Sequence, residues 1–287
     1  MNTPNPIPER IFPDAWADLQ SSEYAEHQRR PNAYRLAFAD TEFLLRRETR
    51  GIRCQLELLK PDLAQQAQGI ENTIVVFGSA RFGDEESARA KLAQAQAQGD
   101  AQAMALAQRQ LRNAHYYEQA RAFTKLVAQY SDSRPAAERL YICTGGGPGI
   151  MEAANRGAHE AGAKTVGLNI ALPHEQQPNP YVTPSLSFKF HYFALRKMHF
   201  MMRAKALLAF PGGFGTLDEL FEVITLVQTR KSQAVPIILF GSEFWKKLIN
   251  MDLLVDEGTI SPEDLELFQY VDDPQTAWDR IRHFYQL

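Results

Sequence analysis

Short apolar stretches alternate with longer amphipathic segments along most of the chain. Runs rich in Ile, Val, Leu and Phe are typical of buried strands, and apolar residues at helical spacing follow several of them. The predicted strands are residues 73–77, 140–143, 165–170, 186–190, 206–210 and 235–240. Strands that alternate with helices indicate an α/β fold with a doubly wound, mainly parallel sheet.

Three segments depart from this alternation. Residues 1–70 predict an N-terminal helical extension, in which a proline-rich start precedes a helix running from Phe43 to Pro61. Residues 85–130 are rich in Ala and Gln, which favour helix, and with a break at Gly99-Asp100 they predict a helical hairpin or one interrupted helix. Residues 241–287 predict short helices that cover the sheet. The α/β domain itself is therefore expected at residues 71–287.

The chain of 287 residues has an ordinary globular composition, with 45% hydrophobic and 23% charged residues. Its formal charge of −3 offers no positive field to attract nucleic acid. Cys54 and Cys143 lie far apart without a CxxC pair, so neither a disulfide framework nor a metal site is expected. No secretory signal or membrane-spanning run is evident. We therefore expect a cytoplasmic protein that binds neither membrane nor nucleic acid.

Glycine-rich turns follow three of the predicted strands. Because the carboxyl ends of parallel strands meet at one edge of a sheet, the turns should surround one crevice. N–H groups at the start of a helix lack intrahelical partners and, together with the helix dipole, attract phosphate. The residues predicted to bind phosphate or substrate here are Gly78, Ser79, Gly146, Gly147, Gly212, Gly213, Gly215 and Thr216.

Two common nucleotide motifs do not fit these turns. Residues 78–83 have the glycine spacing of a Walker loop, but Asp84 stands where the lysine is required. Residues 145–149 lack GxGxxG spacing, and the next strand ends in Asn169 and Ile170 rather than an acidic residue. NAD binding is therefore disfavoured. The same glycines also suit a plain strand-to-helix turn, in which Pro148 starts the helix.

Glu219 allows a structural and a chemical interpretation. Residues 216–219 match a capping box, in which Thr216 caps the helix and Glu219 accepts the Thr216 N–H. A carboxylate at a helix N-terminus should also have a lowered pKa, because the dipole favours its charged form. An ionised Glu219 would suit a base or a hydroxyl acceptor.

Arg196 and Lys197 form a second candidate group. Arginine binds phosphate and sugar oxygens in a planar, bidentate manner, whereas lysine acts as a point charge. In a helix, Lys197 is turned about 100° from Arg196. The alternative is a pair of cations on a surface helix. His199, between Met198 and Phe200, is expected at the edge of the core rather than in catalysis.

At these residues the chain resembles a known family. TGGGPGIMEAAN at residues 144–155 and PGGFGTLDE at residues 211–219 resemble the paired signatures of the Lonely Guy family, and Arg196-Lys197 resembles its basic pair. Members of this family are Rossmann-like nucleotide phosphoribohydrolases, often mislabelled as lysine decarboxylases. The resemblance covers about residues 72–270. A decarboxylase would require a lysine placed for a pyridoxal Schiff base, and the sequence offers none.

The resemblance implies hydrolysis of the N-glycosidic bond of a nucleoside 5′-monophosphate, such as a cytokinin riboside monophosphate or AMP. Arg196 and Glu219 would be the catalytic pair, with Lys197 and the glycine turns binding substrate. No metal or other cofactor is implied, and the protein would be a homo-oligomer, a dimer or larger. A non-catalytic carrier of a nucleotide or phosphorylated cofactor on the same fold is the alternative. A third hypothesis, partner docking through the arginine-bearing helix, is opposed by the net charge.

Overall fold

The computed structural model describes residues 32–173 and 177–287, and the chain divides into two units, residues 1–56 and 57–287. The proline-rich start of the predicted extension lies outside the described residues. In the first unit, α3 (Thr41–Leu44) follows two 3-10 turns, η1 (Asn32–Tyr34) and η2 (Ala37–Ala39). The Asp40 carboxylate caps α3 by accepting the Phe43 N–H at 3.1 Å.

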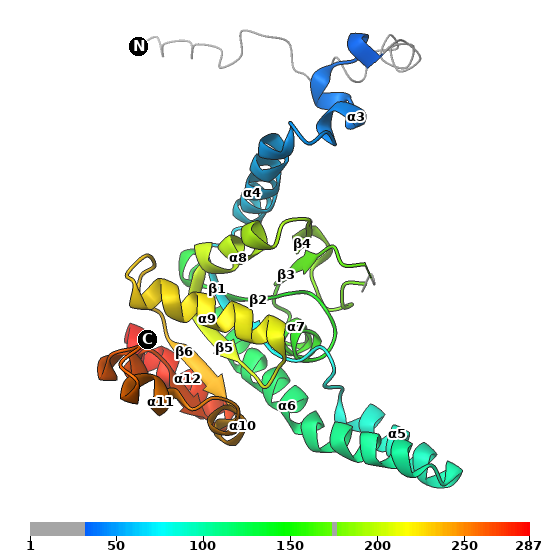
Figure 1. The fold of residues 1–287 in the computed structure, drawn as a ribbon, viewed down its shortest axis with the longest axis vertical. Helices are drawn as coiled ribbons and strands as arrows, with labels where there is room; N and C mark the ends of the chain where they lie inside the picture. The colour runs from blue at the N-terminus through cyan, green and yellow to red at the C-terminus, as the bar shows by residue number, and fades with distance from the viewer. Residues whose placement is uncertain (1–31, 174–176) are drawn as a thin grey trace. The chain divides into compact units, whose positions relative to one another are not determined.

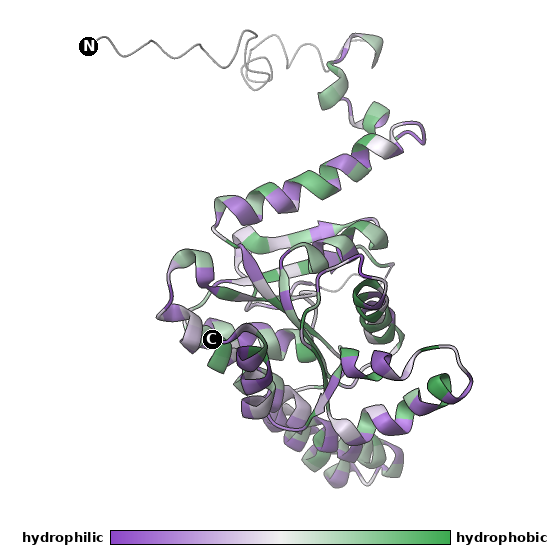
Figure 2. Ribbon diagram, turned by 90° about the vertical axis from the view of Figure 1, so that its left-hand side faces the viewer, coloured by the Kyte–Doolittle hydropathy of each residue, from purple (hydrophilic) through white to green (hydrophobic). Residues whose placement is uncertain are grey.

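The helix predicted from Phe43 to Pro61 is wrong at both ends. The structure instead has α3, a turn, and then α4 (Arg50–Ala67), which contains Pro61. In the turn, the Thr49 hydroxyl donates to the carbonyl of Arg46 at 2.9 Å, a bond that competes with helix continuation. Figure 2 shows α4 banded in hydrophilic and hydrophobic residues along its length.

Pro61 fits inside α4 because the carbonyl that it leaves free finds another donor. Proline has no N–H for the carbonyl of Glu57, four residues earlier. Nε2 of His199 lies 3.3 Å from that oxygen. The helix can therefore continue to Ala67, six residues beyond the predicted end.

The second unit is built on one sheet of seven parallel strands in the order β4-β3-β2-β1-β5-β6-β7, of which Figure 1 labels β1 to β6. The predicted doubly wound, Rossmann-like α/β fold is confirmed. Strand order reverses between β1 and β5, and ligands of such sheets bind at the carboxyl ends beside this switch point. The strands are β1 (Asn72–Phe77), β2 (Leu140–Thr144), β3 (Thr165–Ile170), β4 (Ser187–Phe190), β5 (Ala204–Ala209), β6 (Ile237–Phe240) and β7 (Gln269–Val271).

Helices cover both faces of this sheet, so its central strands are buried on each side. On β1, Val75 and Phe77 pack into a core with α8, α9 and α10, whereas Ile74 and Val76 pack into a second core with α6, α7 and α12. This explains why the strand sequences are continuous apolar runs rather than alternating ones. The main helices are α5 (Glu85–Gln98), α6 (Ala101–Asp132), α7 (Ile150–Glu160), α8 (Phe193–Met202), α9 (Phe214–Gln228), α10 (Ser242–Leu248), α11 (Met251–Asp256) and α12 (Pro274–Tyr285).

The predicted hairpin between the first two strands is formed by α5 and α6 (Figure 1). Gly99 ends α5 in the left-handed region at φ 66°, where glycine is favoured. The Asp100 carboxylate then caps α6 by accepting the N–H groups of Gln102 and Ala103. None of the described helices has both the length and the apolar character needed to cross a membrane.

The tail contains the predicted short helices and one strand that the sequence pattern did not indicate. Strand β7 pairs in parallel with β6 and extends the sheet. It has three residues, Gln-Tyr-Val, which is too short to establish a period.

Candidate active site

A pocket of about 720 Å³ opens at the carboxyl ends of β1, β2, β3 and β5. All three glycine turns line this pocket, in agreement with the prediction that they surround one crevice at the carboxyl edge of the sheet. Gly146 and Lys197 are not among its lining residues. The predicted residues that do line it are Gly78, Ser79, Gly147, Arg196, Gly212, Gly213, Gly215, Thr216 and Glu219.

Main-chain hydrogen bonds fix the turns to one another. The Ser79 N–H donates to the Pro211 carbonyl, and the Ser79 carbonyl accepts the Ile150 N–H, both at 3.0 Å. A Cβ on Gly149 would lie 2.3 Å from the Ser79 oxygen, and Gly149 has φ 75°. Glycine is therefore required there by both contact and conformation. The pocket floor is a bonded unit rather than three separate loops.

A buried polar network supports the turn after β2, and the sequence did not single it out. The Thr144 hydroxyl accepts the Gly146 N–H at 2.9 Å and donates to Asn155 Oδ1 at 2.7 Å. Asn179 Nδ2 donates to the Gly147 carbonyl at 3.0 Å and to Asn155 Oδ1 at 2.9 Å. Gly146 itself has φ 71° and thus serves the turn, outside the pocket lining.

The turn after β5 presents the start of α9 to the pocket. Gly213 is the N-cap of α9 and offers no side chain to its first N–H groups. Leu217 N–H makes the first intrahelical bond, to the Gly213 carbonyl at 3.1 Å, so the three N–H groups before it have no intrahelical acceptor. A Cβ on Gly213 or Gly215 would meet nothing within 4 Å. The absence of side chains there leaves open space beside unpaired donors.

The capping box predicted at residues 216–219 is wrong. Because α9 begins at Phe214 with Gly213 as N-cap, Thr216 lies inside the first turn. Glu219 instead forms an ion pair with Arg196, with 2.9 Å between Oε1 and Nη2. The carboxylate is thus directed to α8, across the pocket, and does not return to the start of its own helix.

Arg196 is held rigidly in this pair. Its Nε donates to the Leu168 carbonyl of β3 at 2.8 Å, and its guanidinium lies 5.0 Å from the centroid of the Phe200 ring. A Cβ on Gly145 would lie 2.9 Å from Arg196 Nη2, so this glycine leaves room for the guanidinium. The side chain is only 10% exposed.

Helix α8, which carries Arg196, is positioned by α4. The Glu57 carboxylate accepts the N–H groups of His191 and Tyr192 at 2.9 and 3.1 Å, at the start of α8. His199 contacts the Glu57 carbonyl, is 2% exposed, and has a pKa lowered by its burial. Its position outside the pocket lining agrees with its predicted place in the core.

Burial raises the pKa of Glu219 to about 7, and the Arg196 charge only partly opposes this effect. The lowered pKa predicted from the helix dipole is therefore wrong. Glu219 is the sixth residue of α9, beyond the first turn where the dipole acts, and its side chain is only 12% exposed. A carboxyl group that titrates near neutral pH can exchange a proton during a reaction.

Lys197 lies away from the pocket because it follows Arg196 on α8. Its Nζ pairs with Asp218 at 2.7 Å and Glu222 at 2.8 Å. The ammonium group of Lys197, which was predicted to bind substrate, is thus already paired with two carboxylates. Asp218 is also at the pocket wall, where its charge is balanced by Lys197.

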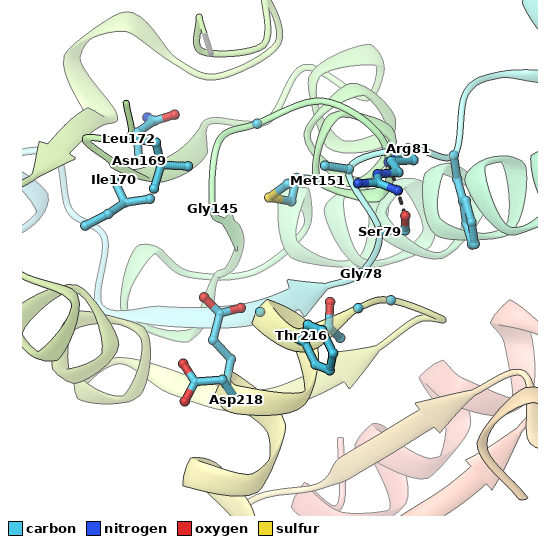
Figure 3. A pocket seen from close by; sticks show the side chains of 18 of the residues that line it. Gly78, Ser79, Arg81, Gly145, Met151, Asn169, Ile170, Leu172, Thr216 and Asp218 are labelled. Atoms are coloured by element: carbon cyan, nitrogen blue, oxygen red, sulfur yellow. Dashed lines mark hydrogen bonds between the residues drawn. The ribbon is translucent and has the colours of Figure 1, made fainter. Parts of the chain in front are cut away.

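The pocket lining differs between its two sides. Figure 3 shows Ser79, Arg81 and Thr216 on one side and Asn169, Ile170 and Leu172 on the other. Arg81 and Asn169 were not predicted as site residues, although Arg81 is in the turn after one predicted strand and Asn169 is near the end of another, which is the available signal. Within the described residues, no cluster of His, Cys, Asp and Glu could hold a metal ion.

The fold and the pocket define a Rossmann-like α/β protein whose crevice lies at the switch point of its sheet. A family model described as "Possible lysine decarboxylase" matches residues 151–281. A probable cytokinin riboside 5′-monophosphate phosphoribohydrolase from Oryza sativa subsp. japonica is 33% identical over 121 residues, covering 41% of this chain and 48% of that protein. These matches confirm the predicted resemblance to the Lonely Guy family.

Two further similarities are lower in sequence identity. A pyrimidine/purine nucleotide 5′-monophosphate nucleosidase from Escherichia coli (strain K12) is 30% identical over 126 residues, which are 40% of this chain and 27% of the nucleosidase. The chain spans about half the length of the plant relative named above. A solved molybdenum cofactor binding protein from Rippkaea orientalis is 16% identical with a TM-score of 0.46, over 75% of this chain and 98% of that one.

Proposed function

We propose that this protein hydrolyses the N-glycosidic bond of nucleoside 5′-monophosphates to give a free base and ribose 5-phosphate. The observation that carries the proposal is the buried Arg196–Glu219 pair, in the same pocket as the uncapped start of α9. The names of the two relatives above support this reaction class. The family resemblance further implies a homo-oligomer, which light scattering of the purified protein tests. The cytoplasmic location is proposed from the composition and the two separated cysteines.

The two ends of the pocket suit the two ends of such a substrate. The N–H groups at the start of α9, with Ser79 and Thr216, would bind the 5′-phosphate. The apolar side chains of Ile170 and Leu172 would contact the base at the opposite end (Figure 3). The ribose would then lie between them, near Glu219.

Cleavage of a ribosyl–nitrogen bond builds positive charge on the sugar ring, as in glycoside hydrolysis. In the proposed reaction, a water oxygen bonds to C1′ while the bond from C1′ to the base nitrogen breaks. Glu219 accepts a proton from the water and returns it to the departing base, which leaves with the electron pair of the broken bond. Arg196 holds the Glu219 carboxylate toward the sugar and fixes its orientation.

A decarboxylase function, as in the description of the family model, lacks the required group. Pyridoxal-dependent decarboxylation needs a lysine in the pocket for a Schiff base. The described pocket lining contains arginines but no lysine, and Lys197, which is not part of that lining, is paired with Asp218 and Glu222.

A substrate panel tests the proposal. Purified protein is mixed with AMP, an N6-modified adenosine monophosphate, other nucleoside monophosphates and plain adenosine, and the products are separated by chromatography. We expect free base and ribose 5-phosphate from at least one monophosphate over many turnovers, and little base from adenosine. Stoichiometric nucleotide binding without turnover by folded protein would instead support the carrier alternative.

A further inference from the structure

The charges that line the pocket are balanced except at one position. Within the described residues its charged lining side chains are Arg81, Arg196, Asp218 and Glu219. Arg196 pairs with Glu219, and Asp218 pairs with Lys197. The guanidinium of Arg81 has no ion-pair partner among the described residues. Among the residues that the structure describes, the pocket therefore has one cation without a neutralising carboxylate.

Arg81 is at the phosphate end of the pocket. It follows Ser79 by two residues, and the main-chain N–H of Arg81 donates to the Ser79 hydroxyl at 3.1 Å (Figure 3). The same turn is bonded to Pro211, next to the start of α9. The arginine is thus carried on a turn fixed to the glycine turn that presents the unpaired N–H groups.

The next residue anchors this turn to the helical hairpin. The Phe82 ring stacks on Tyr116 of α6, with ring centroids 6.0 Å apart. The Tyr116 ring in turn packs closely on Gly241, where an added Cβ would lie only 2.9 Å from the ring. Phe82 packs partly into the core and also lines the pocket, and Arg81 is exposed beside it, so the stacked ring holds the loop that carries the guanidinium.

We propose that Arg81 binds the substrate phosphate together with the start of α9, and so selects nucleotides over nucleosides. This inference rests on the proposed function for the identity of the ligand. A phosphomonoester carries close to two negative charges at neutral pH, and uncharged N–H groups alone leave them unneutralised. A guanidinium supplies the countercharge and two parallel hydrogen bonds.

The test compares R81A with R89A, which removes an arginine from the exposed Arg89–Glu85 pair on α5. We expect R81A to lower kcat/KM for AMP roughly 10- to 100-fold, mainly through KM, because one charge-assisted contact is lost. Residual hydrolysis of adenosine should not change in R81A, and R89A should match the wild type. Equal KM values for AMP in R81A and R89A overturn the proposal.

A binding measurement separates this inference from the proposed reaction. E219Q, and E219Q combined with R81A, are titrated calorimetrically with AMP and with inorganic phosphate. Arg81-dependent binding in a protein that never releases base would leave the inference standing and remove the hydrolase. Hydrolysis of AMP by the wild type, with AMP binding unaffected by R81A, would support the hydrolase and overturn the inference about Arg81. R81Q and R81K serve if R81A does not fold: R81Q should behave as R81A, and R81K should restore part of the affinity.

Discussion

At the scale of single residues, Glu219 is subject to two opposing influences. Its burial favours the neutral form, and Arg196 at 2.9 Å favours the charged form. The outcome is a pKa raised to about 7, so the group is partly ionised at neutral pH. A base with a pKa near the working pH combines a useful ionised fraction with a useful affinity for protons.

This titration predicts the pH dependence of the proposed reaction. If ionised Glu219 accepts the proton, kcat/KM for AMP should rise as the pH increases through about 7 and then level off. E219Q should lose roughly 10²- to 10⁴-fold in kcat together with this rise. Initial rates from about pH 5 to about pH 9 measure both effects.

Glu222 offers the matched control, because it is on the same helix and pairs with Lys197 outside the pocket. E222Q should keep the rise, displaced at most slightly to lower pH, because the Glu222 charge is a minor cause of the raised pKa of Glu219. The phosphate of AMP also titrates, near about pH 6, so the E219Q profile is the reference for the substrate's own ionisation. A rise that persists unchanged in E219Q would argue against Glu219 as the base.

At the scale of helices and strands, the architecture could be predicted from the sequence because each βα unit repeats the same pattern. Buried strands on both faces give continuous apolar runs, and glycine turns mark their carboxyl ends. Two elements were not predicted correctly, each for its own physical reason. Strand β7 is too short to show a period, and Pro61 is accommodated by a partner, His199, that is 138 positions away in sequence and so invisible to a local pattern.

The site could be predicted only as far as topology determines it. Parallel strands place their carboxyl ends together, which explains why the three glycine turns meet. The pairing of Arg196 with Glu219 depends on how α8 packs beside α9, and no spacing in the sequence encodes it. Arg196 and Lys197 point about 100° apart on the helix. The sequence gives this angle but does not show which of the two side chains faces the pocket.

The α5–α6 hairpin gives a prediction at this scale. Y116A should release Phe82, loosen the turn that carries Arg81, and raise KM for AMP roughly 10-fold with a smaller change in kcat. Y116F keeps the ring and should behave as wild type. Steady-state kinetics of both variants checks this, and equal KM values in Y116A and Y116F would show that the hairpin does not support the pocket.

At the scale of the whole molecule, the raised pKa of Glu219 links the site to stability. The folded state binds the proton more tightly than the unfolded chain, whose glutamate has the ordinary value of 4.5. The stabilising contribution of protonated Glu219 is therefore complete below pH 4.5 and is lost as the pH rises toward 7. Ionisation of the buried Glu219 carboxyl group near neutral pH thus lowers the free energy of unfolding of the wild type.

E219Q should remove this dependence, because glutamine resembles the protonated form at every pH. The free energy of unfolding of E219Q relative to wild type should increase by about 2–3 kcal/mol between about pH 5 and about pH 8. Urea unfolding of both proteins at these two pH values measures the difference, in which other titrating groups cancel. E222Q should show a much smaller change, because it leaves the buried Glu219 carboxyl group in place. A relative stability that falls with pH would mean that the Arg196 charge outweighs burial and that Glu219 is ionised throughout.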